Sequence, residues 1–245
     1  MHQEGNGDVN QSFFITGTDT GVGKTFITNG IASAMKRRGV SVGVMKPVET
    51  GCPKKLGKLM PIDAIALKKA AGCPCPLDVV NPYRFAAPVA PSVATRLSRK
   101  KISLNKIKVA YTAHAKVHAS MLVEGAGGLF TPLSSTGKDT MADLALKLKV
   151  PVIIVAPSRL GAINHTLLTI HAAQGSRLKI CGFILNNAQR PDKRDMSLRY
   201  NAGEIQRLSS AAFLGEVPFM KKNGLPSTGE AVFDAIVKRL LVTYP

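Results

Sequence analysis

The sequence has few aromatic residues and contains no long apolar run. Aromatic residues make up 5% of the 245 residues, and tryptophan is absent. No stretch approaches the ~20 consecutive apolar residues that a transmembrane helix requires. The opening MHQEGNGDVNQS has neither a basic start nor an apolar signal region. We therefore expect a cytoplasmic protein with no membrane partner and a short disordered tail at residues 1–11.

Cysteine is also scarce. The chain has four, Cys52, Cys73, Cys75 and Cys181, and only Cys73 and Cys75 are close, as Cys-Pro-Cys. We find no matching pair of histidines or cysteines at the spacing of a zinc site. The sequence therefore predicts reduced thiols rather than a metal centre or a disulfide.

Acidic residues are the third shortage. The sequence has 15 aspartates and glutamates but 33 lysines and arginines, which gives a net charge of +18. Such a charge makes nucleic acid a candidate partner. The basic residues are scattered, however, and no interleaved aromatics or RNA-binding signature accompany them. We expect no nucleic-acid partner. The positive electrostatic field of these residues would favour an anionic substrate and a nucleotide.

Strand-like apolar runs alternate with helical patterns along the chain. The runs begin at Phe13, Val40, Ala119, Val150, Lys179 and Ala211. This order is typical of a mainly parallel sheet covered on both faces, and the length suits one large core. The sequence predicts an α/β fold: a single-domain, doubly wound, mainly parallel sheet flanked by helices, over residues 12–245.

The stretch FFITGTDTGVGKTFITNG, residues 13–30, reads as a strand, a glycine-rich turn and a helix. The usual phosphate-loop pattern places its first glycine where Thr18 stands, and here the glycine is one residue earlier, at Gly17. In such a loop, backbone N–H groups point at phosphate oxygens, Lys24 neutralises charge and the Thr25 hydroxyl can bind Mg²⁺. An ordinary turn that happens to spell Gly-Lys-Thr is the alternative.

Polar residues at other strand ends are further candidates, because ligands of such sheets bind beyond the carboxyl ends of the strands. Lys46, followed by a proline that keeps it extended, can hold developing negative charge there. A surface lysine is the alternative. Thr50 is either a turn residue or a hydroxyl donor to substrate, and Asn186 and Asn187 end a later strand.

Two carboxylates could complete an oxygen-rich site. Glu124 follows an apolar run and precedes Gly-Ala-Gly-Gly, where glycine lets the backbone approach a phosphate closely. Asp63 begins a helical pattern. If Thr25, Asp63 and Glu124 converge, they form the kind of site that Mg²⁺ prefers. A capping or salt-bridging role is the alternative for both acids.

Taken together, these residues resemble the dethiobiotin synthetase family, which has the P-loop NTPase fold. The matching segments are TGTDTGVGKT, KPVETG, DAIAL, NPYRFAAPVAPSVA, LVEGAGGLFTPL, PVIIVAPSRLGAINH, LNN and LGEVPF. The resemblance accounts for the displaced glycine, because the phosphate loop of this family has the sequence pattern GTDT-VGKT. It also implies ligase chemistry in biotin biosynthesis.

The resemblance implies that CO₂ and 7,8-diaminopelargonic acid give a carbamate, that ATP phosphorylates it, and that the second amine closes the ring of dethiobiotin. Lys24 and Lys46 would be catalytic, and Thr25, Asp63 and Glu124 would bind Mg²⁺. ATP is then a co-substrate, and bicarbonate supplies the CO₂.

The remaining family positions divide into two groups. The substrate positions are Thr20, Thr50, Arg159, Gly161, Ala162 and Asn164. The nucleotide positions are Gly21, Val22, Gly23, Lys24, Thr25, Phe26, Asp63, Glu124, Gly125, Ala126, Gly127, Asn186, Asn187, Glu216, Val217 and Pro218. The resemblance further implies a homodimer with substrate at the interface, where residues 159–165 serve the partner.

Two other classes share this phosphate loop. Partition and septum-positioning ATPases carry a signature lysine five residues before the loop lysine, where this chain has Asp19. Cobyrinate-type amidoligases would need a glutamine-hydrolysing domain, for which no signature is apparent. A regulatory ATPase is therefore the alternative function.

Overall fold

The chain is described by a computed structural model that covers residues 11–192, 194–220 and 227–243. Within these residues a central sheet has six parallel strands in the order β10-β9-β8-β1-β7-β2. The strands are β1 (Gln11–Gly17), β2 (Val42–Met45), β7 (Ser120–Glu124), β8 (Val152–Pro157), β9 (Ile180–Asn186) and β10 (Phe213–Val217). Because all six run the same way, their carboxyl ends share one edge.

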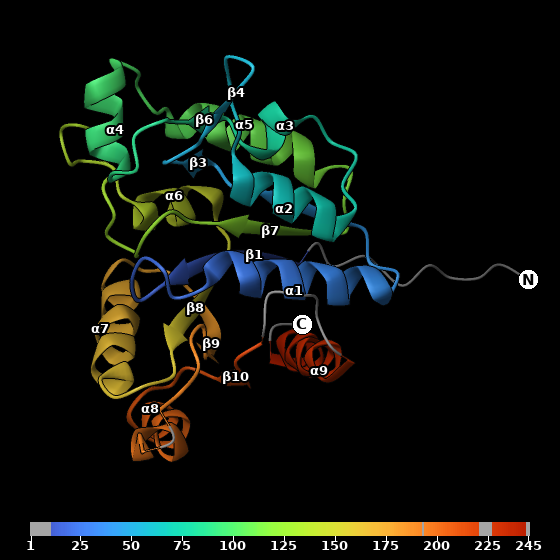
Figure 1. Cartoon of the computed structure of the whole chain (residues 1–245), viewed down its shortest axis with the longest axis vertical. Coiled ribbons are helices and arrows are strands. Elements are labelled where there is room, and N and C mark those ends of the chain that lie inside the picture. The colour runs from blue at the N-terminus through green and yellow to red at the C-terminus, as the bar shows by residue number, and fades with distance from the viewer. Residues whose placement is uncertain (1–10, 193, 221–226, 244–245) are drawn as a thin grey trace, which may run out of the picture.

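Helices cover both faces of the sheet (Figure 1). They are α1 (Lys24–Arg37), α2 (Ile62–Ala71), α3 (Leu77–Val80), α4 (Pro91–Ser98), α5 (Leu104–Ala115), α6 (Met141–Leu148), α7 (Ala162–Gly175), α8 (Asn201–Leu208) and α9 (Ser227–Thr243), with a 3₁₀ helix η1 (Met196–Arg199). In Figure 1, α1 lies between α2 and α9 along one face.

Strand β1 shows how the sequence builds two cores. Side chains alternate across a strand, so Phe13 and Ile15 point to one face and Phe14 to the other. The first face packs against α1, α2 and α9, and the second against α5 and α6. Beside the second core, α7 and α8 cover β8 and β9 through a cluster that includes Ile154 and Phe183. This is the doubly wound arrangement that the sequence predicted.

Two small sheets lie beside the main one. Strand β3 (Val48–Glu49) pairs in parallel with β6 (Tyr83–Arg84), and β4 (Lys54–Lys55) forms an antiparallel hairpin with β5 (Lys58–Leu59). Strand β3 follows β2 after Lys46 and so extends the chain along the edge where the carboxyl ends of the six strands lie.

The predicted fold class is confirmed. The structure adds local detail to these runs, since α7 begins at Ala162 and residues 54–59 form the hairpin β4–β5. In the ranges described, no helix is both long and apolar enough to cross a membrane. Residues 1–10 of the expected tail lie outside the described residues.

Candidate active site

The predicted phosphate loop connects β1 to α1 at the carboxyl edge of the sheet. Gly21 and Gly23 adopt positive φ angles of 77° and 92°, a region that glycine enters without steric strain. The Lys24 ammonium donates to the Asp19 carbonyl at 2.9 Å, so the lysine folds back over its own loop. Lys24 is only 6% exposed. The loop thus presents a buried cation at the start of a helix, where anions are favoured.

Asn186, at the end of β9, holds this loop from the side. Its side-chain amide donates to the Val22 carbonyl at 2.8 Å. The fit is close, because a Cβ added at Gly23 would lie 2.1 Å from the Asn186 amide nitrogen. The predicted strand-end asparagine therefore contacts the loop directly.

Lys46, Asp63 and Glu124 converge from three elements. The Lys46 ammonium follows β2, donates to a Glu124 carboxylate oxygen at the end of β7, and lies 3.2 Å from an Asp63 oxygen in the first turn of α2. Lys46 is 5% exposed and Glu124 is fully buried. A buried pair of this kind is stabilised only while both partners are present.

Thr25 joins the same group. Its hydroxyl donates to Glu124 Oε1 at 2.8 Å, while Glu124 Oε2 is buried and has no hydrogen-bond partner in the part of the chain that the structure describes. An unpaired buried carboxylate oxygen beside a hydroxyl and the Asp63 carboxylate is a set of hard oxygen donors, which fits Mg²⁺. The convergence that the sequence left conditional is thus present.

Glu49 is a site residue that the sequence analysis missed. Its two carboxylate oxygens accept from the backbone N–H groups of Asp63 and Ala64, each at 3.0 Å. It therefore caps α2, whose own N-cap residue, Pro61, has no side-chain cap. The sequence holds one hint, an acid three residues after Lys46 in β3, but its contact with residue 63 is a tertiary one.

These side chains line a cavity of about 310 Å³. Its lining includes most predicted residues of the phosphate and metal positions, together with Glu49: Thr20, Gly21, Gly23, Lys24, Thr25, Lys46, Thr50, Asp63, Glu124, Ala126 and Gly127. Phosphate loop, lysine pair and carboxylates thus share one space.

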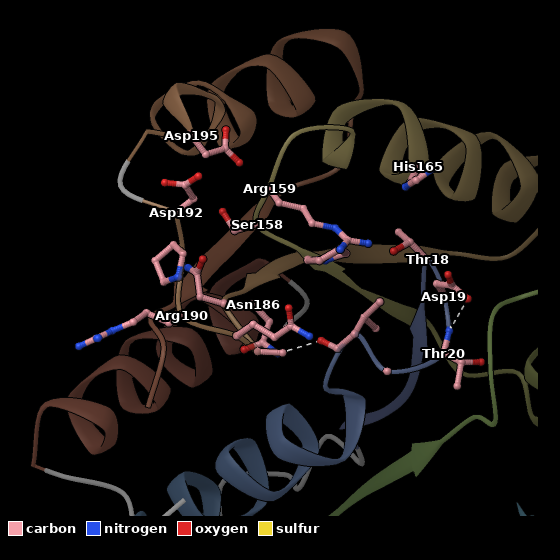
Figure 2. A pocket seen from close by; sticks show the side chains of 17 residues that line it. Thr18, Asp19, Thr20, Ser158, Arg159, His165, Asn186, Arg190, Asp192 and Asp195 are labelled. Atoms are coloured by element: carbon pink, nitrogen blue, oxygen red, sulfur yellow. Dashed lines mark hydrogen bonds between the residues drawn. The ribbon is translucent and has the colours of Figure 1, made fainter. Parts of the chain in front are cut away.

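A second cavity, of about 440 Å³, lies on the other side of the loop (Figure 2). Thr20, Gly21 and Val22 line it together with Arg159, Asn186 and Asn187. Figure 2 shows Arg159 extending toward the side where Thr18 and Asp19 lie. The loop between the cavities is therefore accessible from both.

Other predicted residues line neither cavity: Phe26, Gly125, Gly161, Ala162, Asn164, Glu216, Val217 and Pro218. Several of them contact residues that do. The Gly125 carbonyl is 3.5 Å from the Lys46 ammonium, and Asn187 donates its side chain to Glu216 at 2.8 Å and its backbone N–H to Val217 at 2.9 Å. Gly161 is the N-cap residue of α7, with φ 93°, and Asn164 is exposed.

The two lysines have different electrostatics. Burial and the neighbouring Lys46 charge lower the pKa of Lys24 to about 8. Burial also acts to lower the pKa of Lys46, but the Glu124 and Asp63 carboxylates outweigh it and raise that pKa above its usual value. Lys46 is therefore a fixed cation, whereas Lys24 lacks a full counter-charge and would gain one from a phosphate.

The parallel sheet, the phosphate loop and the carboxyl-edge site define a P-loop NTPase. The cell division ATPase MinD of Pyrococcus furiosus has a similar structure, with a TM-score of 0.60 and 14% identity over 96% of this chain and 99% of that one. The septum site-determining protein MinD of Pyrococcus horikoshii, complexed with Mg-ADP, also gives 0.60, with 16% identity over 95% and 96%. At these identities the likeness concerns the fold alone.

Sequence comparison narrows this class. Residues 11–226 match the family described as AAA domain. ATP-dependent dethiobiotin synthetase BioD of Thermodesulfovibrio yellowstonii is 36% identical over 89% of this chain and 92% of the relative. The enzyme of the same name from Anaeromyxobacter dehalogenans is 42% identical over 85% and 90%. The chain belongs to the dethiobiotin synthetase family, which confirms the resemblance.

Proposed function

We propose that this chain is an ATP-dependent dethiobiotin synthetase that closes the ureido ring of dethiobiotin from 7,8-diaminopelargonic acid and CO₂. Its family membership supports the reaction. The observation that carries the proposal is the position of Lys46, held by Glu124 and Asp63 in the same cavity as the phosphate-loop lysine, Lys24. Two cations in one space suit phosphoryl transfer to an anion.

The chemistry has three steps. One amine attacks CO₂ and loses a proton, which leaves a carbamate; a carbamate oxygen then attacks the γ-phosphorus of ATP, and ADP leaves. The second amine attacks the carbamoyl carbon, phosphate leaves, and the amine releases its proton. The first step places negative charge on the carbamate oxygens, and the other two move negative charge among carbamate and phosphate oxygens, so fixed cations close to both stabilise it.

Each lysine has its own part in these steps. Lys24 and the backbone N–H groups of residues 21–25 would hold the nucleotide phosphates. Lys46 would hold the carbamate, and the hydroxyls of Thr20 and Thr50, which line the same cavity, would orient the substrate's nitrogens and carbamate. Because the carboxylates already anchor Lys46, little reorganisation is needed when the substrate arrives.

Thr25, Asp63 and Glu124 would hold Mg²⁺. When bound, Mg²⁺ would neutralise phosphate charge. The carboxylates meanwhile keep Lys46 protonated, and Glu49 keeps Asp63 in place by capping the helix that carries it.

We assign the base of ATP to the region of Asn186, Asn187 and residues 215–218. The hydrogen bonds from Asn187 to Glu216 and Val217 support this, because they join the ends of β9 and β10 into one wall beside the loop.

We also propose a homodimer in which Arg159, Gly161, Ala162 and Asn164 serve the partner's substrate. The exposure of Leu160, at 80%, and of Asn164 supports this, since both lie in a segment beside the phosphate loop. We further propose that residues 12–245 form one ligase domain that acts in the cytoplasm without a nucleic-acid partner. Light scattering at several protein concentrations tests the dimer, and a monomer that makes dethiobiotin would contradict it.

The decisive experiment is to incubate the purified chain with 7,8-diaminopelargonic acid, bicarbonate and Mg-ATP and to measure dethiobiotin and phosphate together. We expect equal amounts of both, dependent on the diamine and lost in Lys46→Ala. ATP hydrolysis that is indifferent to the diamine, without dethiobiotin, would indicate a regulatory ATPase instead.

A further inference from the structure

A group of soft ligands lies away from the proposed active site. Cys73 and Cys75 follow the end of α2, His114 is in the last turn of α5, and His118 lies in the turn that leads into β7. Their ligand atoms, one thiol sulfur or ring nitrogen each, all lie within 4.8 Å of one another. The sequence analysis missed this group because the Cys-Pro-Cys and the His-x₃-His segments are about 40 residues apart.

The spacing within the group matches a tetrahedral metal site. Cys73 Sγ is 3.4 Å from His114 Nε2 and 3.9 Å from His118 Nε2. Zinc bonds of ~2.3 Å to sulfur and ~2.0 Å to nitrogen put ligands of a tetrahedral site about 3.5 Å apart. Cys73 therefore already stands near ligand distance from both imidazoles.

Both imidazoles are oriented for binding. His118 Nδ1 lies 3.0 Å from the His114 carbonyl, so Nδ1–H donates to that carbonyl and the lone pair is on Nε2, the nitrogen that faces Cys73. A hydrogen bond of this kind is what fixes the tautomer of metal-bound histidines. His118 is also closely seated, because a Cβ added at Gly43 would come within 3.0 Å of its ring.

His114 is hard to explain without a ligand. The residue is 2% exposed, its Nδ1 has no hydrogen-bond partner in the described ranges, and its Nε2 faces only the Cys73 sulfur. A buried imidazole with so few polar contacts is unfavourable.

The surroundings suit a closed structural site. Cys73 and His114 are buried, while Cys75 and His118 are half-buried and leave a path for an ion to enter. Two thiols and two imidazoles favour zinc over hard cations such as Mg²⁺. All four cysteines are free, so the thiols are available.

We propose that Cys73, Cys75, His114 and His118 bind Zn²⁺ in a four-coordinate structural site. The ion ties the end of α2 to the end of α5 and to the start of β7. Because Glu124 ends β7 and Asp63 begins α2, this site lies at the opposite end of both elements from the active site. The proposal does not depend on the proposed function.

The test begins with metal analysis of the full-length chain, purified without a histidine tag in the presence of reductant. Mass spectrometry of the metal content should give one zinc per chain. The chelator-treated chain, titrated with Co²⁺ without oxygen, should show the thiolate charge-transfer and tetrahedral absorption bands of a Cys₂His₂ site. Zn²⁺ added afterwards should remove the bands, and chelation should lower the melting temperature.

Matched variants separate this site from general effects on folding. Cys73→Ser and His118→Gln should lose the bound zinc and the cobalt spectrum. Cys181→Ser, which removes a buried thiol elsewhere in the core, and His171→Gln, on the exposed side of α7, should keep both. Circular dichroism verifies that each variant is folded.

The wild-type chain alone can overturn the proposal, even if a variant fails to fold. Failure of the reduced chain to take Zn²⁺ from a chromophoric chelator without oxygen would do so. So would a wild-type zinc content in folded Cys73→Ser, or a cobalt spectrum without thiolate charge transfer.

Discussion

The two ends of helix α2 have opposite chemistry. At its start, the Asp63 carboxylate and the cap from Glu49 adjoin a fixed lysine and a buried carboxylate, so charge is concentrated and mostly paired. At its end, Cys73 adjoins two imidazoles and a second thiol. Sites that must respond to charged substrates are built from hard groups, whereas groups that only need to hold elements together can be soft.

This contrast predicts that changes at the charged end affect turnover, while changes at the thiol end affect stability. The largest effect should come from Lys46→Ala, which we expect to lower kcat by ~10³-fold because it removes a fixed cation from the developing charge. Steady-state dethiobiotin formation measures it.

Lys46→Ala also leaves Glu124 buried without its counter-ion, a loss of about 3–5 kcal/mol when a buried pair is broken. The control is the double variant Lys46→Met/Glu124→Gln, in which neither group is charged. Its melting temperature should recover toward the wild type while its activity stays low. Recovered activity in this variant would contradict a charge-based role for Lys46.

The next largest effect should come from Gly23→Ala. The new Cβ would lie 2.1 Å from the Asn186 amide and the residue would keep a strained φ, so we expect Mg-ADP to bind ~100-fold more weakly. Titration calorimetry measures the affinity. Gly39, just beyond the other end of α1, also has a positive φ of 78° but open space around it. Gly39→Ala should therefore lower stability alone, and equal loss of affinity in both variants would contradict the specific contact.

A smaller effect should follow from Glu49→Ala, which removes the cap of α2. We expect a loss of about 1 kcal/mol in stability and, because Asp63 shifts, a fall on the order of 10-fold in kcat/KM. The matched control is Thr140→Ala, which breaks the capping box of α6 outside the cavity. It should reduce stability by a similar amount and leave kcat/KM unchanged; a similar loss of kcat/KM in the control would point to stability as the cause.

The smallest effect is a pH dependence. With its pKa at about 8, Lys24 loses its proton in the free protein as the pH rises through 8, whereas bound phosphate favours the charged form. Binding then requires proton uptake, so Mg-ADP affinity should fall about fourfold between pH 7 and pH 8.5. Calorimetry in two buffers of different ionisation enthalpy detects the proton, and no uptake at pH 8.5 would contradict the lowered pKa.

Local patterns accounted for most of the fold. The apolar run of β1, the glycine-rich turn and the periodicity of α1 lie within 30 residues, so propensity and motif could be read together. The hairpin β4–β5 was missed because its turn residues, Leu56 and Gly57, both have positive φ, and leucine is not typical of such a turn.

The candidate site was predictable where a polar residue ends a strand. Lys46, Glu124 and Asn186 each do so, and the geometry of a parallel sheet brings them together. Contacts set by packing were not predictable: Glu49 reaches the backbone of α2 only because β3 lies beside it, and His114 meets Cys73 only because the last turn of α5 lies beside the segment that follows α2. Neither pair is marked by sequence spacing.

The shared use of Glu124 by Lys46 and Thr25 has a consequence for inhibitor design. One carboxylate already compensates both the ammonium and the hydroxyl, whereas Lys24 in the same cavity lacks a full counter-charge. An anion therefore gains more than a neutral molecule does from entering this cavity. Selective ligands should therefore carry an anion that reaches Lys24 while Lys46 stays paired with Glu124 and Asp63, and they should bind more tightly when a divalent cation adds positive charge beside these carboxylates.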